Sequence, residues 1–150
     1  MPRHQSTAPH YALHPQLAEA THPLASLALC DVRLMDDSNY PWLVLVPRIA
    51  NAVELLDLDA AQRHLLTDEI DRIGRLLRTA FHPHKLNVAA LGNLVPQLHV
   101  HVIARDTDDP AWPAPVWGRV AARPYTPEAL VERVTLLHNR LAQPADRPSS

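Results

Sequence analysis

The sequence contains little cysteine and glycine, and it has no long apolar run. Its one cysteine, Cys30, excludes an internal disulfide and follows the apolar residues 27–29, so we expect a small core residue rather than a reactive thiol. Three glycines against 15 prolines predict short, stiff connections. No segment approaches the ~20 apolar residues of a membrane span, and residues 1–6 lack the apolar part of a secretory signal. These absences predict a soluble, cytoplasmic protein.

A basic block is also missing. Lys and Arg number 14 against 16 Asp and Glu, which gives a formal net charge of −2. This balance argues against non-specific binding of nucleic acid, whose phosphate backbone is held by clustered positive charge. Small phosphorylated ligands remain possible, because amides and imidazoles can hold them. With 150 residues, 47% of them hydrophobic, the chain is long enough for one globular core.

The chain divides into a flexible N-terminal arm at residues 1–14, a single domain at 15–143 and a disordered tail at 144–150. Pro15 predicts the start of a short helix that continues through residues 16–20. We expect one strand from residue 24 to 35 and another over the continuous apolar run at 42–46.

Two longer helices follow from apolar residues spaced about 3.6 apart. The first begins near the capping carboxylates of residues 57–59, ends at 82–84 and buries Leu66, Ile70, Ile73, Leu77 and Phe81. Its charged residues, which predict a solvated face, are Glu69, Asp71, Arg72, Arg75 and Arg78. The second helix begins at Thr126-Pro127-Glu128, and its apolar stripe is Leu130, Val134, Leu137 and Leu141.

From residue 97 to 102, polar and apolar residues alternate without a break. This alternation predicts a strand whose apolar residues (Leu98, Val100 and Val102) face the core. Gln97, His99 and His101 then share the opposite face at intervals of roughly 7 Å, so all three can reach one bound group. A solvated polar face would show the same alternation, and the pattern alone leaves that alternative open. Residues 85–91 predict a further strand that pairs with this one through a tight loop around Gly92.

This stretch resembles the signature of the histidine triad (HIT) nucleotide hydrolases and transferases, His-φ-His-φ-His-φ-φ, where φ is apolar. His99 and His101 match its second and third histidines, and Gln97 stands in place of the first. Residues 40–48, Tyr-Pro-Trp-Leu-Val-Leu-Val-Pro-Arg, resemble a family strand that ends in a proline and a basic residue. The resemblance covers residues 25–110. It implies an α+β fold, an antiparallel sheet of about five strands with a long helix on it and a C-terminal helix.

The resemblance also implies roles for the matching residues. His99 would be the nucleophile and would be transiently nucleotidylated, because a neutral imidazole keeps a lone pair available near pH 7. His101 would contact the phosphate and assist the leaving group, and Gln97 would hold the phosphate or leaving group by its amide. Three further residues are implied in substrate binding: Asn87 and Asn93 at the phosphate and nucleophile, and Asp36 at the ribose. Substrates of this family are dinucleoside polyphosphates, nucleoside phosphoramidates or nucleotidylated conjugates, without an obligatory metal or other cofactor.

Two departures from the family keep alternatives open. Gln97 removes a candidate acid or base, and Trp42 stands where the family usually has a histidine five residues before the proline. A non-catalytic nucleotide-binding module is therefore an alternative. A divalent-metal site on His99 and His101, completed by His82, His84 or an Asp, is another.

Two further expectations concern the surface. Family members are commonly homodimers, and the apolar stripe of the 57–81 helix is one candidate interface. Trp112 and Trp117 lie in a proline-rich loop at 106–118 that cannot form regular structure. We expect these tryptophans to pack against the body of the protein, with a wall of the ligand site as the alternative.

Overall fold

The structure, a computed structural model, describes residues 9–144. It contains one antiparallel sheet in the order β1-β2-β3-β5-β4. The strands are β1 (Thr21–Ser26), β2 (Cys30–Met35), β3 (Trp42–Pro47), β4 (Lys85–Ala89) and β5 (Val100–Arg105). The helices are α1 (Pro15–Ala20), α2 (Ala60–Phe81) and α3 (Pro127–Leu141), with a 3₁₀ turn, η1, at Leu55–Asp57. The expected α+β fold is confirmed, including the pairing of β4 with β5.

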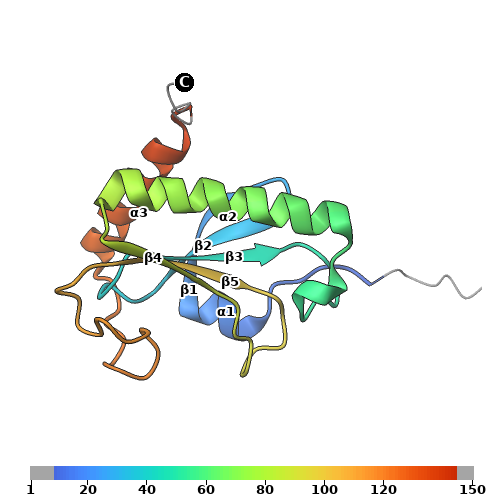
Figure 1. Cartoon of the computed structure of the whole chain (residues 1–150), viewed down its shortest axis with the longest axis horizontal. Helices are drawn as coiled ribbons and strands as arrows, with labels where there is room; N and C mark the ends of the chain where they lie inside the picture. Colours follow the sequence, from blue (N-terminus) through green and yellow to red (C-terminus); the bar gives the residue numbers. More distant parts are fainter. Residues whose placement is uncertain (1–8, 145–150) are drawn as a thin grey trace, which may run out of the picture.

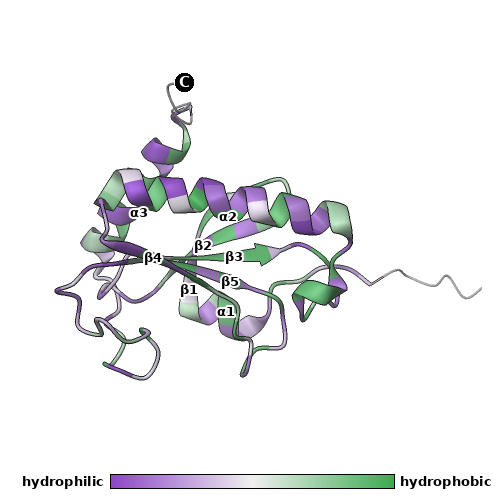
Figure 2. Ribbon diagram, in the orientation of Figure 1, coloured by the Kyte–Doolittle hydropathy of each residue, from purple (hydrophilic) through white to green (hydrophobic). Residues whose placement is uncertain are grey.

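The sheet has two differently covered faces. Helix α2 crosses one face, and α1 lies on the other (Figure 1). The main core fills the space between α2 and the sheet, and α2 turns its apolar side toward the strands (Figure 2). A smaller core occupies the opposite face, where Leu17 of α1 packs with residues of β3, β5 and the 111–117 loop. The histidines lie on this second face.

Helix α2 begins as its sequence predicts, since Asp59 caps it and forms a reciprocal capping box with Gln62. One expectation for its solvated face is wrong. Glu69 is buried, and its carboxylate accepts hydrogen bonds from the backbone N–H groups of Leu29 (2.7 Å) and Cys30 (3.0 Å). Two buried amides in a turn require an acceptor, and this carboxylate supplies it.

The expected single strand at residues 24–35 is wrong, because the same turn interrupts it. The chain reverses at residues 27–29, so the segment forms the antiparallel pair β1–β2 instead of one strand. Because the segment is mostly apolar and residues 27–29 contain neither glycine nor proline, the sequence does not indicate the turn. Cys30, as expected, is fully buried, and burial raises the pKa of its thiol far above the ordinary value.

The expected dimer surface on α2 is also wrong. Its apolar stripe is covered within the chain, because Leu66, Ile73 and Leu77 belong to the main core. None of the helices within residues 9–144 is long and apolar enough to cross a membrane.

The predicted N-terminal arm and C-terminal tail fall largely on residues 1–8 and 145–150, which lie outside the described residues. Within the arm, Tyr11 and Leu13 pack against the smaller core, and the Tyr11 hydroxyl donates to Asp31 (3.1 Å). The segment at residues 9–14 therefore follows the sheet closely, along the face that bears the histidines.

Candidate active site

His99 and His101 lie side by side on the sheet face away from α2. His101 is in β5 and His99 immediately precedes it, so the strand begins three residues later than the alternation from Gln97 predicts. The apolar residues that alternate with them, Leu98, Val100 and Val102, belong to the main core as expected. Both imidazoles are buried, and their ring centroids are 4.9 Å apart. The two rings can therefore address one small group.

The hydrogen bonds of His99 fix which of its nitrogens is free. Its Nδ1 lies 2.6 Å from the backbone carbonyl oxygen of Gln97, and a carbonyl oxygen only accepts. Nδ1 therefore carries the proton and donates it. In the neutral ring this leaves the lone pair on Nε2, which is the arrangement that a nucleophilic imidazole requires.

His101 has the opposite arrangement. Its Nδ1 accepts a hydrogen bond from the indole N–H of Trp42 (3.0 Å), because an indole N–H only donates. The proton of the neutral ring then sits on Nε2. Burial, reinforced by the neighbouring His99, lowers the pKa of His101 to about 4. His101 is thus a neutral hydrogen-bond donor at physiological pH.

The two tryptophans closest to His101 explain a departure seen in the sequence. Trp42 lies on β3 beside β5, and its side chain fills the place where a histidine was expected. Trp117 packs edge-on against both His101 (5.1 Å between centroids) and Trp42 (5.6 Å). In the sequence, Trp42 is noted only as the absence of a family histidine. Its hydrogen bond to His101 follows from the pairing of β3 with β5, which the sequence does not reveal.

Trp112 and Trp117 have different surroundings. Trp117 packs against the smaller core, as expected, and its ring also lies edge-on against His101. Trp112 packs edge-on against His84 (5.2 Å) and under the guanidinium of Arg105 (5.6 Å), which is the expected packing role.

Beside His99 is a pocket of about 280 Å³. It lies between η1 and the loop that precedes β5, and its lining includes Leu55, Leu56, Leu91 and Gly92. The leucines are exposed, with Leu56 at 89%, so the pocket offers apolar surface that the fold itself does not cover. Glu54, an exposed carboxylate, also lines it.

Gln97 is engaged elsewhere. Its side-chain oxygen accepts from the backbone N–H of His14 (2.8 Å), and its amide nitrogen donates to the carbonyl of Ala12 (2.8 Å). These two bonds fasten residues 12–14 beside the histidines. Nothing in the sequence at 97 or 12–14 signalled this pairing across more than 80 residues.

The other sequence-predicted residues lie on three different segments of the chain. Asn87 lies on β4 and accepts from Arg105 (2.8 Å), and Asn93 is exposed in the loop before β5. Asp36 follows β2, which β3 separates from β5. Its carboxylate accepts from the backbone of Tyr125 (3.0 Å) and pairs with His22 (3.1 Å).

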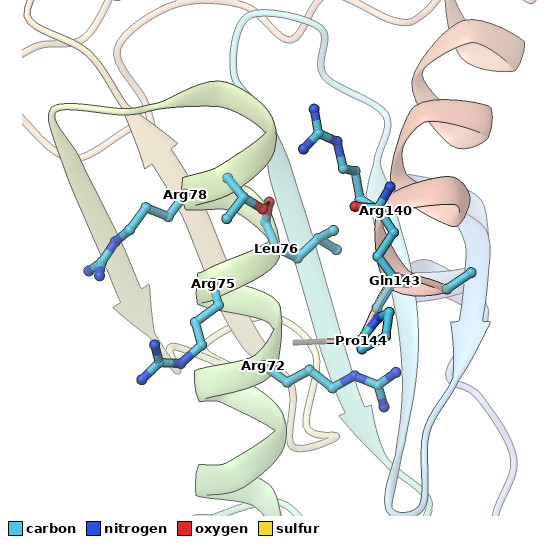
Figure 3. A pocket seen from close by; sticks show the side chains of 10 residues that line it. Arg72, Arg75, Leu76, Arg78, Arg140, Gln143 and Pro144 are labelled. Carbon is cyan, nitrogen blue, oxygen red and sulfur yellow. Dashed lines mark hydrogen bonds between the residues drawn. The ribbon is translucent and has the colours of Figure 1, made fainter. Parts of the chain in front are cut away.

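A larger cavity, about 610 Å³, lies between α2 and α3, away from the histidines. Four arginines line it, but the side chains of Arg75 and Arg78 point away from α3 while Arg72 points toward it (Figure 3). Its polar groups diverge, so we do not place the chemistry there.

The divalent-metal site considered for His99 and His101 finds no third ligand in the part of the chain that the structure describes. Among residues 9–144, no group of three His, Cys, Asp or Glu side chains is close enough to hold a metal ion. His84, one proposed third ligand, instead packs against Trp112, and its backbone N–H donates to Asp106 (3.2 Å).

Known proteins resemble this chain in sequence and in fold. The HIT domain family matches residues 20–108. A histidine triad protein from Bradyrhizobium japonicum is 46% identical over 89% of this chain and 99% of its own, with a TM-score of 0.86. A histidine triad protein from Marinobacter aquaeolei VT8 is 43% identical over 88% of this chain and 96% of its own, with a TM-score of 0.86. One from Sinorhizobium meliloti 1021 is 39% identical over 87% of this chain and 96% of its own, with a TM-score of 0.84. No curated protein matches the chain.

Proposed function

Because the chain belongs to the histidine triad (HIT) family, we propose that it is a nucleotide hydrolase or nucleotidyl transferase that works through a nucleotidyl-histidine on His99. One observation carries the proposal. The Gln97 carbonyl holds the Nδ1 proton of His99, so the lone pair of the neutral ring lies on Nε2.

The first step forms a bond between His99 Nε2 and the α-phosphorus, while the bond from phosphorus to the leaving group breaks and its electron pair departs with that group. The ring then carries a positive charge, which the Gln97 carbonyl stabilises through the Nδ1–H bond. In the second step, water attacks the phosphorus, the N–P bond breaks, and its electron pair returns to Nε2. The water proton passes to the solvent.

His101 would stabilise the charge on the transferring phosphoryl group. Its Nε2–H is a donor fixed by the Trp42 bond, and a preorganised donor in a buried place needs little reorganisation during reaction. The backbone around Gly92, which has φ +68°, and the side chain of Asn93 are proposed to add contacts to phosphate. Asn87 and Asp36 are also proposed to contact the substrate, and both have hydrogen-bond partners within the protein.

The apolar pocket next to His99 suits a planar base or another apolar part of the substrate. We propose dinucleoside polyphosphates or nucleoside phosphoramidates as the substrate class, and adenosine compounds as the first to test. The homodimer stays a proposal, now with the outer edge of β4 as its candidate surface. The cytoplasmic location also stays a prediction.

The test is intact-protein mass spectrometry after brief mixing with diadenosine polyphosphates, beside a His99→Ala control. We expect a transient adduct of AMP size on the wild type only, together with released AMP. A non-catalytic module is the second candidate, because Gln97 is already engaged by residues 12–14. Nucleotide binding with neither adduct nor AMP would favour that module and overturn the hydrolase.

A further inference from the structure

We propose that this site cleaves bonds to leaving groups that depart as stable anions, such as the phosphate end of a phosphoanhydride, in preference to amines and alkoxides. The inference rests on the proposed function and narrows its substrate class. Its basis is that no described side chain beside His99 is arranged to give a proton to a leaving group.

His101 is the nearest candidate donor, and its geometry prevents proton transfer. A histidine acts as an acid when both nitrogens carry protons, but Nδ1 of His101 already accepts from the Trp42 indole. Protonation of Nδ1 would point its N–H at the indole N–H of Trp42, so that two buried donors would face each other without an acceptor. The neutral ring offers only its Nε2–H, whose loss would leave an imidazolate. His101 can stabilise charge, but it cannot protonate a leaving group.

The other polar groups near His99 are also unsuited to this task. Gln97 has no acidic proton, and both ends of its amide are bound to residues 12–14. His14, which this bond places next to Gln97, accepts at Nδ1 from the backbone N–H of Gln16 (3.1 Å). That nitrogen therefore carries no proton in this arrangement. Glu54, which also lines the pocket, is an exposed carboxylate, and a carboxylate only accepts hydrogen bonds.

The consequence for the reaction follows from the electron pair that leaves with the departing group. A nucleoside diphosphate carries that pair as a stable anion and needs no proton. An amine or an alkoxide departs only if a proton arrives as the bond to phosphorus breaks. General acid catalysis typically contributes on the order of 10²–10⁴-fold, and this site would lack that contribution for poor leaving groups.

Two aryl esters of AMP separate leaving-group acidity from size. The 4-nitrophenyl and phenyl esters have nearly the same shape, but only 4-nitrophenol leaves as a stable anion near neutral pH. We expect kcat/KM to be higher for the 4-nitrophenyl ester by on the order of 10³-fold, in line with an absent general acid. Values within about tenfold of each other would overturn the preference, because a proton must then be supplied.

A gain-of-function variant provides the second readout. Gln97→His adds an imidazole without the bonds that hold residues 12–14, and we expect it to accelerate the phenyl ester more than the nitrophenyl ester. Gln97→Ala, the matched control, frees the same residues without adding an acid and should leave the ratio of the two rates unchanged. A ratio that falls equally in both variants would overturn the preference.

Failure of the proposed function has a different signature. If wild type and His99→Ala release 4-nitrophenol equally and neither forms an adenylyl adduct, the nucleotidyl-histidine is wrong and the preference falls with it. An adduct on wild type, with both esters cleaved at similar rates, overturns the preference alone.

Discussion

The two ends of one face of β5 use polar residues in opposite ways. At one end, Arg105 is only 1% exposed and makes four hydrogen bonds, two to Asp109 and one each to Asn87 and the Ala114 carbonyl. At the other end, His99 and His101 are also buried, but each has one nitrogen bound within the protein and one without a protein partner among the described residues. Arg105 is a structural group with its bonding capacity nearly filled.

The difference identifies the reactive end of the strand. A buried polar group whose bonds are satisfied stabilises the fold, whereas a buried ring with one fixed and one free nitrogen is prepared for a ligand. The tryptophans repeat this contrast, since Trp112 packs against Arg105 and Trp117 packs against His101. Burial alone would not separate the two ends.

The largest expected effect comes from replacing Arg105, the structural residue at one end of this face. Arg105→Leu leaves Asp109, now without its guanidinium partner, in a buried place, so we expect the free energy of unfolding to fall by about 3–5 kcal/mol. Urea unfolding followed by circular dichroism measures the change. Any remaining folded protein should still form the adduct on His99.

Arg75→Leu is the matched control. Arg75 pairs with Asp71 at 2.8 Å, but both side chains are more than half exposed, so the change should leave the free energy of unfolding nearly unchanged. Equal losses for the two variants would contradict the structural role of Arg105.

The second prediction concerns the histidine end. Because the folded protein holds the pKa of His101 at about 4, below the ordinary value of 6.5, the unfolded chain binds more protons between these values. This contribution to stability is complete above about pH 6.5 and is lost as the pH falls through about 4, up to about 3 kcal/mol.

Urea unfolding near pH 7.5 and pH 4.5 measures this loss against His101→Gln, which lacks the titrating group. We expect the wild type to lose about 2–3 kcal/mol more than the variant over this range. The same pH dependence in both proteins would show that His101 is not held neutral by the fold.

The smallest expected effect lies at Gln97. Gln97→Ala removes two hydrogen bonds to residues 12–14, one of them to the exposed Ala12, where water can replace the lost partner. We therefore expect the free energy of unfolding to fall by about 1 kcal/mol. Amide hydrogen exchange at His14 should become several-fold faster, because the free energy needed to open residues 12–14 falls by about that amount. Asn93→Ala, at an exposed residue of the preceding loop, is the control. Unchanged exchange at His14 would show that residues 12–14 are held without Gln97.

Much of the fold was predictable because local patterns agree with it. The alternation around Val100 and Val102 predicted which side of β5 faces the core, and Asp59 and Thr126 cap α2 and α3 as their sequences indicate. The turn at residues 27–29 was missed, because a buried carboxylate from α2 replaces the usual turn residues there. An acceptor 40 residues away leaves no local pattern.

For the site, the sequence by itself determined that two imidazoles share one strand face, because side chains alternate along a strand. Only the tertiary structure decided the chemical state of each ring. The indole of Trp42 reaches His101 from a neighbouring strand, and the same fold attaches Gln97 to residues 12–14. Proton positions depend on hydrogen-bond partners, and these partners are distant in the chain and adjacent only after folding.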